Sequence, residues 1–391
     1  MDIKVEFRDP RISLEEKLKL QRDTKLKRFT ISLFIFALVI ISSVLLVELG
    51  TYEKVTVSQE YLKEVKGNSS YTQFSEGILR TSRDGVSFTD KKGNETWNKP
   101  YQFKTPVTVT NYRSGAVADK GGNDIVVFND ETILGEIHTT NPIEKIAVSG
   151  NGIVGVLMKN ESAPFVMVYD AAGELLVEHQ STISGKGYPI SMTLSPKGKQ
   201  MIVTYMCVVD GIQSTRVVYY DFSGVGKEEN GYQVKEDVYK NQVIPIGIYL
   251  DEKRSVLVSD NSLIFYNGGS HPEVEKKIKI DKNIRSFFYD EHYLGFMLQN
   301  QGKEGRELRV YNTKGKEVLS KNIDGEFTNI KIANGDVIMY HGKTCSIYSI
   351  LGIHRFVGEM DQEILEMIPL QGMNRYLMVN EDGLREIRLT K

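Results

Sequence analysis

The apolar positions along the chain form one long block followed by many short runs. The block, from Phe29 to Val47, holds 19 residues without a charge. At 1.5 Å per residue a helix of that length spans roughly 28 Å, about the hydrocarbon thickness of a bilayer. A single segment can cross only as a helix, because a helix satisfies its own backbone polar groups. The pattern therefore predicts one transmembrane helix over residues 29–47.

The charges on either side of this block give it a direction. Glu48 and Glu53 follow its C-terminal end, whereas the N-terminal side carries Lys17, Lys19, Arg22, Lys25, Lys27 and Arg28. Basic residues beside a membrane helix stay in the cytoplasm, so residues 1–28 are predicted to be a cytoplasmic tail. A cleaved signal peptide is the alternative, but its apolar region would be about 7–15 residues long with a small-x-small cleavage site. Neither feature is present here. The tail either fixes the topology or docks a cytoplasmic partner.

Beyond the block, one element recurs: a strand-like run ending in an aromatic residue, followed by a turn with Asp or Asn and Gly. The equivalent positions are Thr89, Phe128, Tyr169, Tyr220, Tyr266, Tyr311 and Tyr348, at spacings of 37 to 51 residues. An aromatic side chain packs between sheets, and Asp or Asn with Gly turns the chain tightly. A second strand pair precedes the recurring element. Four short strands in about 40–45 residues are typical of a β-propeller blade.

The two ends of the repeat region complement each other. After the seventh unit, residues 364–369, 376–379 and 384–389 supply three further strands. Residues 52–61 are a candidate for the missing fourth strand, which would close the ring and remove exposed sheet edges. The sequence thus predicts an all-β, eight-bladed propeller preceded by one transmembrane helix, with seven blades as the alternative. Residues 48–69 are assigned to a stalk and possible closing strand, and residues 70–391 to the extracytoplasmic propeller.

Composition narrows the functional classes. The formal net charge of −2 excludes a strongly basic nucleic-acid binder. The 20 Tyr, 34 Gly and single Trp fit a turn-rich β protein. Cys207 and Cys345 lie in apolar, strand-like runs, which predicts two buried thiols. A disulfide between them is the alternative, and it would require their Cα atoms to lie close together.

Residues with catalytic chemistry do not gather into a motif. The six histidines occupy different units without metal-ligand spacing: His138, His179, His271, His292, His341 and His354. The acidic residues at predicted turns are explained by turn chemistry: Asp84, Asp90, Asp119, Asp170, Asp251, Asp260 and Asp382. No catalytic, cofactor-binding or metal residue and no cofactor is predicted. The longest irregular segment, residues 224–240, is interpreted as a solvated insertion, with a functional loop as the alternative.

Two resemblances rest on particular residues. The segment Thr89-Asp90-Lys91-Lys92-Gly93-Asn94-Glu95-Thr96-Trp97 resembles the tryptophan-docking repeat of quinoprotein-like propellers, whose quinone and calcium ligand motifs are not recognisable here. The full layout is similar to membrane-anchored propeller proteins of Gram-positive, Clostridia-type bacteria, a family whose function is itself not known. That likeness covers the anchor, Ile78-Leu-Arg-Thr-Ser-Arg-Asp-Gly-Val-Ser-Phe88, Thr140-Asn-Pro-Ile-Glu-Lys145 and Asn374-Arg-Tyr-Leu377. It implies a bacterial host and gives no reaction.

Three functions remain open from the sequence. The leading hypothesis is a non-catalytic, membrane-tethered binding or scaffolding module of the cell envelope, with a protein or polymer partner and no nucleic acid. A signal-relay sensor is the second, and its 28-residue tail would need a separate cytoplasmic partner. A quinone- or metal-dependent propeller enzyme is the third. A fold does not by itself imply a function, so enzyme activity stays undecided. The lack of a recognisable catalytic motif favours the binding module.

Overall fold

The computed structural model describes residue 22 and residues 25–39, 51–62, 68–111, 113–159, 165–180, 187–227, 229–299, 305–372 and 374–391. The chain divides into two compact units, Met1–Thr51 and Tyr52–Lys391. In the first unit, residues 25–39 form a helix with exposed side chains. Within the described ranges, no helix combines the length and the apolar character that a membrane crossing requires. The rest of the predicted span, residues 40–47, lies outside the described residues, as does most of the tail 1–28.

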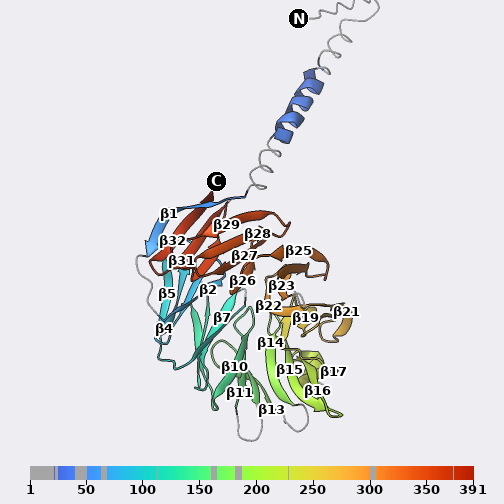
Figure 1. The fold of residues 1–391 in the computed structure, drawn as a ribbon. Helices are drawn as coiled ribbons and strands as arrows, with labels where there is room; N and C mark the ends of the chain where they lie inside the picture. The colour runs from blue at the N-terminus through green and yellow to red at the C-terminus, as the bar shows by residue number, and fades with distance from the viewer. Residues whose placement is uncertain are drawn as a thin grey trace, which may run out of the picture. The chain divides into compact units, whose positions relative to one another are not determined.

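The second unit consists of eight four-stranded antiparallel sheets, here called blades 1 to 8 (Figure 1). Blade 1 contains β2 (Ser70–Phe74), β3 (Gly77–Thr81), β4 (Gly85–Asp90) and β5 (Glu95–Pro100). Blade 2 contains β6 (Pro106–Thr110), β7 (Ser114–Asp119), β8 (Asp124–Asn129) and β9 (Ile133–His138). Blade 3 contains β10 (Ile143–Val148), β11 (Val154–Met158), β12 (Phe165–Tyr169) and β13 (Leu175–Gln180). Blade 4 contains β14 (Tyr188–Leu194), β15 (Gln200–Val209), β16 (Ile212–Asp221) and β17 (Gln233–Lys240).

The remaining blades continue the same order. Blade 5 contains β18 (Ile246–Tyr249), β19 (Arg254–Val258), β20 (Ser262–Asn267) and β21 (Glu273–Lys279). Blade 6 contains β22 (Asn283–Tyr289), β23 (Tyr293–Gln299), β24 (Arg306–Asn312) and β25 (Glu317–Ile323). Blade 7 contains β26 (Asn329–Ala333), β27 (Asp336–His341), β28 (Thr344–Ser349) and β29 (His354–Glu359). Blade 8 contains β30 (Glu366–Pro369), β31 (Arg375–Asn380), β32 (Gly383–Thr390) and β1 (Lys54–Leu62). The predicted eight-bladed propeller is confirmed.

Blade 8 joins the two ends of the ring. Its outer strand, β1, pairs antiparallel with β32, starting at Lys54 opposite Thr390. Just before β1, Tyr52 donates its backbone N–H to Arg355 O of blade 7 at 2.8 Å and forms a parallel bridge with Phe356. The Tyr52 side chain is 6% exposed and belongs to a core cluster shared by blades 7 and 8. The segment entering the ring therefore fastens two blades at once.

The recurring turns have the geometry that their residue types predict. Asp90 accepts the backbone N–H groups of Lys92 and Asn94, both at 2.8 Å, and Gly93 adopts a φ of +79°. Asp170 and Asn312 accept the same pair of N–H groups in blades 3 and 6. A side chain that bonds the backbone two residues ahead fixes the turn locally. The repeat is therefore encoded at the level of single hairpins.

The aromatic residues of blade 1 pack against blade 2, as the tryptophan-docking resemblance implies. Trp97 stacks on Phe88 with ring centroids 6.1 Å apart and lies 5.2 Å from Phe128 of blade 2. Its indole N–H donates to Asn129 O at the end of β8, at 3.0 Å. The indole thus couples neighbouring blades through both an apolar face and a hydrogen bond.

We expect Trp97→Phe to lower the free energy of unfolding by about 1–2 kcal/mol, because the ring face remains but the hydrogen bond to Asn129 O is lost. Denaturant unfolding followed by circular dichroism measures this change. Trp97→Ala should cost more, since it also empties the space between the two phenylalanines. Equal losses for both substitutions would contradict a separate contribution from the hydrogen bond.

The predicted insertion at residues 224–240 is wrong as an irregular segment. Its second half is β17, the outer strand of blade 4, which pairs with β16 from Ser214–Lys240 to Tyr220–Gln233. Only its first half is irregular, with a short helix α3 (Gly224–Lys227) and a 3-10 turn η1 (Asn230–Tyr232). β17 is the outer strand of its blade and is partly exposed to water, so it carries charged residues. These residues conceal the strand pattern in the sequence.

Candidate functional site

One buried charged group lies where blades 7, 8 and 1 meet. Glu366 begins β30 and is 6% exposed. Its Oε1 contacts the ammonium of Lys331 on β26 and accepts the Met367 backbone N–H at 2.7 Å and the Tyr340 hydroxyl at 3.3 Å. Its Oε2 accepts the backbone N–H of Gln73 on β2 at 3.1 Å. One carboxylate thus binds donors from three blades.

Electrostatics at this cluster favour a structural role. Burial lowers the pKa of Lys331, while the Glu366 charge opposes that change. Burial raises the pKa of the neighbouring Cys345 thiol to about 12. A thiol is nucleophilic only as the thiolate, so Cys345 is unreactive at neutral pH. The Glu366 carboxylate already accepts from four donors of the propeller. The cluster therefore stabilises the contact between blades 7, 8 and 1, where the ring closes.

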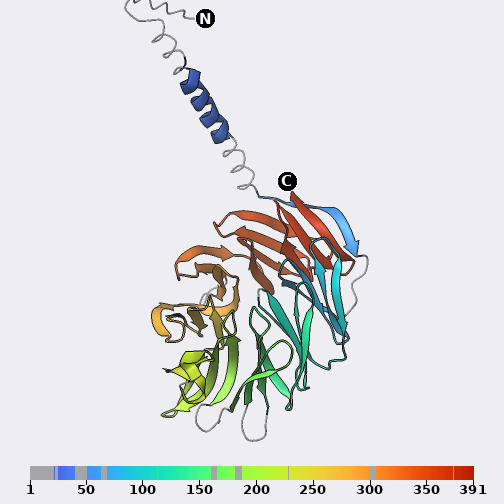
Figure 2. The same cartoon turned by 180° about the vertical axis from the view of Figure 1, so that it is seen from behind.

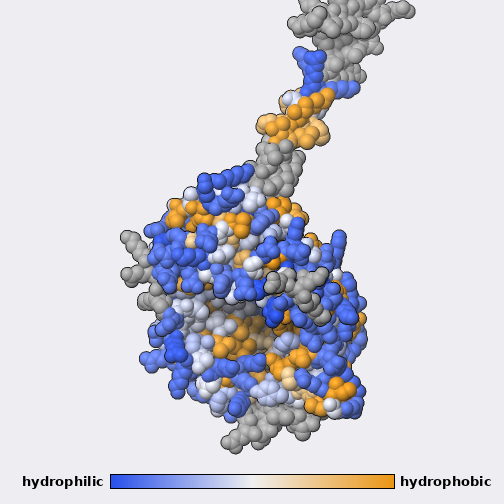
Figure 3. All heavy atoms as spheres, in the orientation of Figure 1, coloured by the Kyte–Doolittle hydropathy of each residue, from blue (hydrophilic) through white to orange (hydrophobic). Residues whose placement is uncertain are grey.

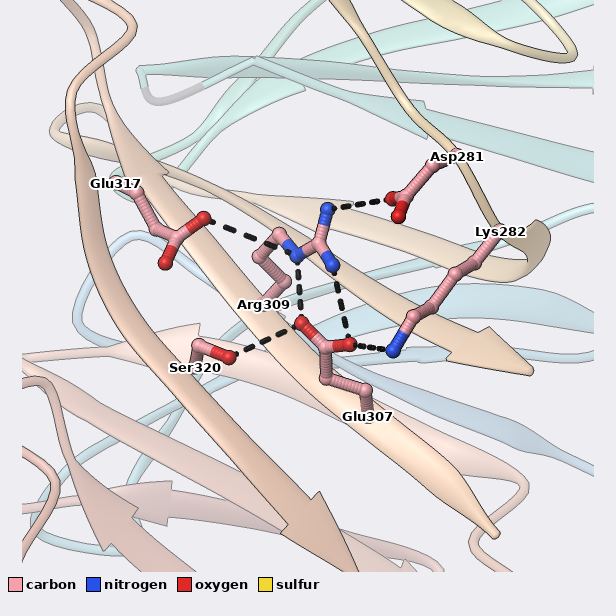
Figure 4. A network of polar contacts seen from close by, with 6 residues as sticks. All are labelled: Asp281, Lys282, Glu307, Arg309, Glu317 and Ser320. Atoms are coloured by element: carbon pink, nitrogen blue, oxygen red, sulfur yellow. Dashed lines mark hydrogen bonds and ion pairs between the residues drawn. The ribbon is translucent and has the colours of Figure 1, made fainter. Parts of the chain in front are cut away.

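A second charged network surrounds Glu307 in blade 6 (Figure 4). Glu307 lies on β24 and accepts from Arg309 Nε at 2.6 Å, from Ser320 Oγ at 3.0 Å and from the Lys282 ammonium. Arg309 also contacts Asp281 at 3.2 Å. The network ties β24 to β25 and to the connection entering β22. Burial alone raises the pKa of Glu307, but hydrogen bonds and charges from Arg309 and Lys282 outweigh burial and hold it at about 2.

The lowered pKa of Glu307 predicts a pH dependence of stability. Its folded-state pKa lies below the ordinary value of 4.5, so the carboxylate stabilises the fold above about pH 4.5 and loses that effect as pH falls toward 2. After discounting for water around the outer members, we expect a contribution of about 1–2 kcal/mol. Denaturant unfolding between pH 2.5 and 7 should show a shallower pH slope for Glu307→Gln. An unchanged slope would assign the pH dependence to other carboxyls.

A third feature is the long hairpin of blade 4, formed by β15 and β16. These strands have ten residues each and are the longest of those described. Asp210 and Gly211 join them with φ values of +53° and +77°, as the two central residues of a type I′ turn require. Apolar side chains near the turn are exposed to solvent: Met206 at 39%, Val208 at 73% and Ile212 at 43%. On β14, Tyr188 is 45% exposed and pairs with Met206.

The other residues considered in the sequence are dispersed. His138 pairs with Asp124 at 2.7 Å. His354 stacks on Tyr348 at 4.2 Å and His341 lies near Thr328 at 3.1 Å, both in blade 7, so the prediction that each histidine occupies a different unit is wrong for these two. Within the described ranges, no three His, Cys, Asp or Glu side chains gather in a way that could hold a metal ion. Both cysteines are free; Cys345 is buried as predicted, whereas Cys207 is half-buried on the blade 4 hairpin. The prediction of two buried thiols is therefore wrong for Cys207.

Sequence reasoning missed Lys331, Glu366 and the blade 4 hairpin. Lys331 and Glu366 are 35 positions apart and lie in different blades, so no local pattern links them. The hairpin did carry a signal, because Asp210-Gly211 lies between two runs of strand-forming residues. Asp-Gly in that context is among the strongest indications of a tight hairpin.

These observations define the class of protein as a closed eight-bladed β-propeller. The sequence of residues 48–389 matches the family of unknown function DUF5711, and the chain belongs to that family. No curated protein matches it in sequence.

Among solved structures, the chain is similar to BamB from Moraxella catarrhalis, with a TM-score of 0.50 and 10% identity over 86% of this chain and 100% of that one. It is also similar to the computationally designed Ika8 protein, with a TM-score of 0.52 and 13% identity over 87% of this chain and 100% of that one. At such low identity the likeness concerns the fold alone.

Proposed function

We propose that the chain is a membrane-tethered propeller that serves as a binding or scaffolding module in the cell envelope. Its N-terminus would lie in the cytoplasm and its ring outside. The uncharged run Phe29–Val47 and the basic residues before it support the anchor and its direction. A rigid ring with many exposed turns supports a role in binding, since such scaffolds present loops to partners.

One observation carries this proposal. The ring takes its closing strand from the residues that come directly after the uncharged run: Tyr52 follows Val47 by five positions. Tyr52 is buried between blades 7 and 8, and β1 begins two residues later. Only residues 48–51 separate the uncharged run from Tyr52, so a chain anchored through this run would keep its ring at the cell envelope. Such placement suits a module that presents its surface to other envelope components.

Cysteine accessibility tests the orientation in intact cells. In a Cys207→Ser background, Leu351→Cys places a thiol at a position that is 83% exposed, and Lys17→Cys places one in the tail. We expect a membrane-impermeant maleimide to label the first variant in intact cells and the second only after permeabilisation. The reverse pattern, or release of the full chain from membranes by alkaline carbonate, would overturn the proposal.

A further inference from the structure

Among the described residues, the tip of the blade 4 hairpin extends past the last strand pairs on both of its sides. Pairing of β14 with β15 ends at Tyr188–Met206, and pairing of β16 with β17 ends at Ser214–Lys240. Among the described residues, the β15–β16 ladder continues through Val208–Gln213 and Val209–Ile212. The backbone N–H of Asn241, which follows β17, donates to Gln213 O at 3.0 Å. Beyond that bond, the tip consists of the Val209–Ile212 rung and its type I′ turn. Such a projection presents side chains without the entropy cost of ordering a loop.

The exposed surface of this tip is apolar. Tyr188, Met206 and Val208 share one face of the hairpin, because they occupy alternate or directly paired positions. Ile212 lies on the opposite face and pairs with Val209. Figure 3 shows apolar residues gathered where β15 to β17 end, at the lower right of the view. Exposed side chains of this size, grouped on one projection, indicate a contact surface.

Charge at the tip narrows the kind of partner. Between Met206 and Gln213 the only charged residue is Asp210, and the Lys240 ammonium neutralises it at 2.7 Å. Segments that bind anionic bilayers carry surplus Lys or Arg beside their apolar residues, and this tip has none. A neutral apolar tip is complementary to an uncharged apolar surface on a protein.

The position of blade 4 in the ring also separates the tip from the entry to β1. Blade 4 is the fourth blade from blade 8 in either direction around the ring. The turn between the second and third strands of a meander lies at the end opposite to the start of the fourth strand. Blade 4 therefore lies across the ring from β1, as Figures 1 and 2 both show. The hairpin tip and the entry to β1 also lie at opposite ends of the blade strands.

From these observations, we infer that the blade 4 hairpin is the docking element for a protein partner that presents an uncharged apolar surface. This inference rests on the proposed binding function and names the surface that performs it. The side chains of Val208 and Met206 make the central contact, and Tyr188, whose hydroxyl donates to Glu144, lies at its edge.

Site-specific photo-crosslinking in the host cell tests the assignment on the full-length chain. A photoreactive residue is introduced at position 208 or, as a matched control, at position 351, where Leu351 is an even more exposed apolar side chain in the turn after β28. We expect position 208 to yield one discrete protein adduct, identified by mass spectrometry, and position 351 to yield none of it. The partner so identified is then purified and titrated against the full-length chain in detergent.

In that titration we expect Val208→Asp to weaken binding at least tenfold, and Leu351→Asp to leave the affinity within twofold. Identical unfolding curves for the two variants would show that the fold is intact, because both positions are solvent-exposed. An adduct with a second copy of the chain, a lipid adduct, or equal crosslinking from both positions would each overturn the assignment. Failure of the maleimide test would instead overturn the membrane topology and leave the docking result to be judged separately.

Discussion

Replacing Glu366 by Ala is expected to destabilise the ring by about 3–5 kcal/mol, the usual cost of removing one partner from a buried ion pair. Four partners are affected at once. The Lys331 ammonium loses its counter-charge, and the Tyr340 hydroxyl and the backbone N–H groups of residues 73 and 367 lose an acceptor. Buried donors left without an acceptor cost more than the hydrogen bonds themselves contribute. Denaturant unfolding of the full-length chain in detergent measures the loss.

A double substitution separates the charge from the packing. In Glu366→Met with Lys331→Met, neither charge remains, so most of the ion-pair penalty should disappear even though the two N–H groups stay unsatisfied. We expect the double variant to be at least 1–2 kcal/mol more stable than Glu366→Ala. If the double variant is instead the least stable of the series, Lys331 contributes through its contacts with other groups and the assignment of the pair is wrong.

The eight blades could be predicted because each repeats a local signal. Asp90, Asp170 and Asn312 fix their turns through backbone N–H groups within four residues, and the preceding aromatic or β-branched residue packs between sheets. Local chemistry of this kind can be read from one sequence. The same reasoning found the three C-terminal strands and pointed to residues 52–61 for the fourth.

The functional features escaped the sequence for different reasons. Lys331 and Glu366 meet only because the ring brings two innermost strands side by side, which is a consequence of tertiary structure. The strand β17 was misread because three consecutive charged residues, 235–237, occupy both of its faces and interrupt the alternation of polar and apolar residues. The hairpin was readable from Asp210-Gly211, but its exposed tip could not be known without the ends of β14 and β17. The solvent exposure of a side chain depends on which residues surround it in space, and the sequence alone does not show this.

Removing the closing strand is expected to have the largest effect on the fold. In a chain whose residues 52–62 are replaced by a Gly/Ser linker of equal length, β32 would become an open edge. Ile387 and Leu389, now 0% and 2% exposed, would lose part of their cover, and Tyr52 would leave the core between blades 7 and 8. Open apolar edges associate with other strands. We expect a fall in Tm of more than about 10 °C, together with self-association on size-exclusion chromatography.

A peptide with the sequence of residues 52–62 should reverse this loss. It can pair with β32 as β1 does, and ligand binding to the folded state raises Tm in proportion to the logarithm of peptide concentration. The same peptide with Tyr52→Ala should rescue less, because the tyrosine supplies the contact with blade 7. A linker variant that keeps the Tm of the natural chain would show that blade 8 holds with three strands. In that case the stability of the ring would not depend on residues 52–62.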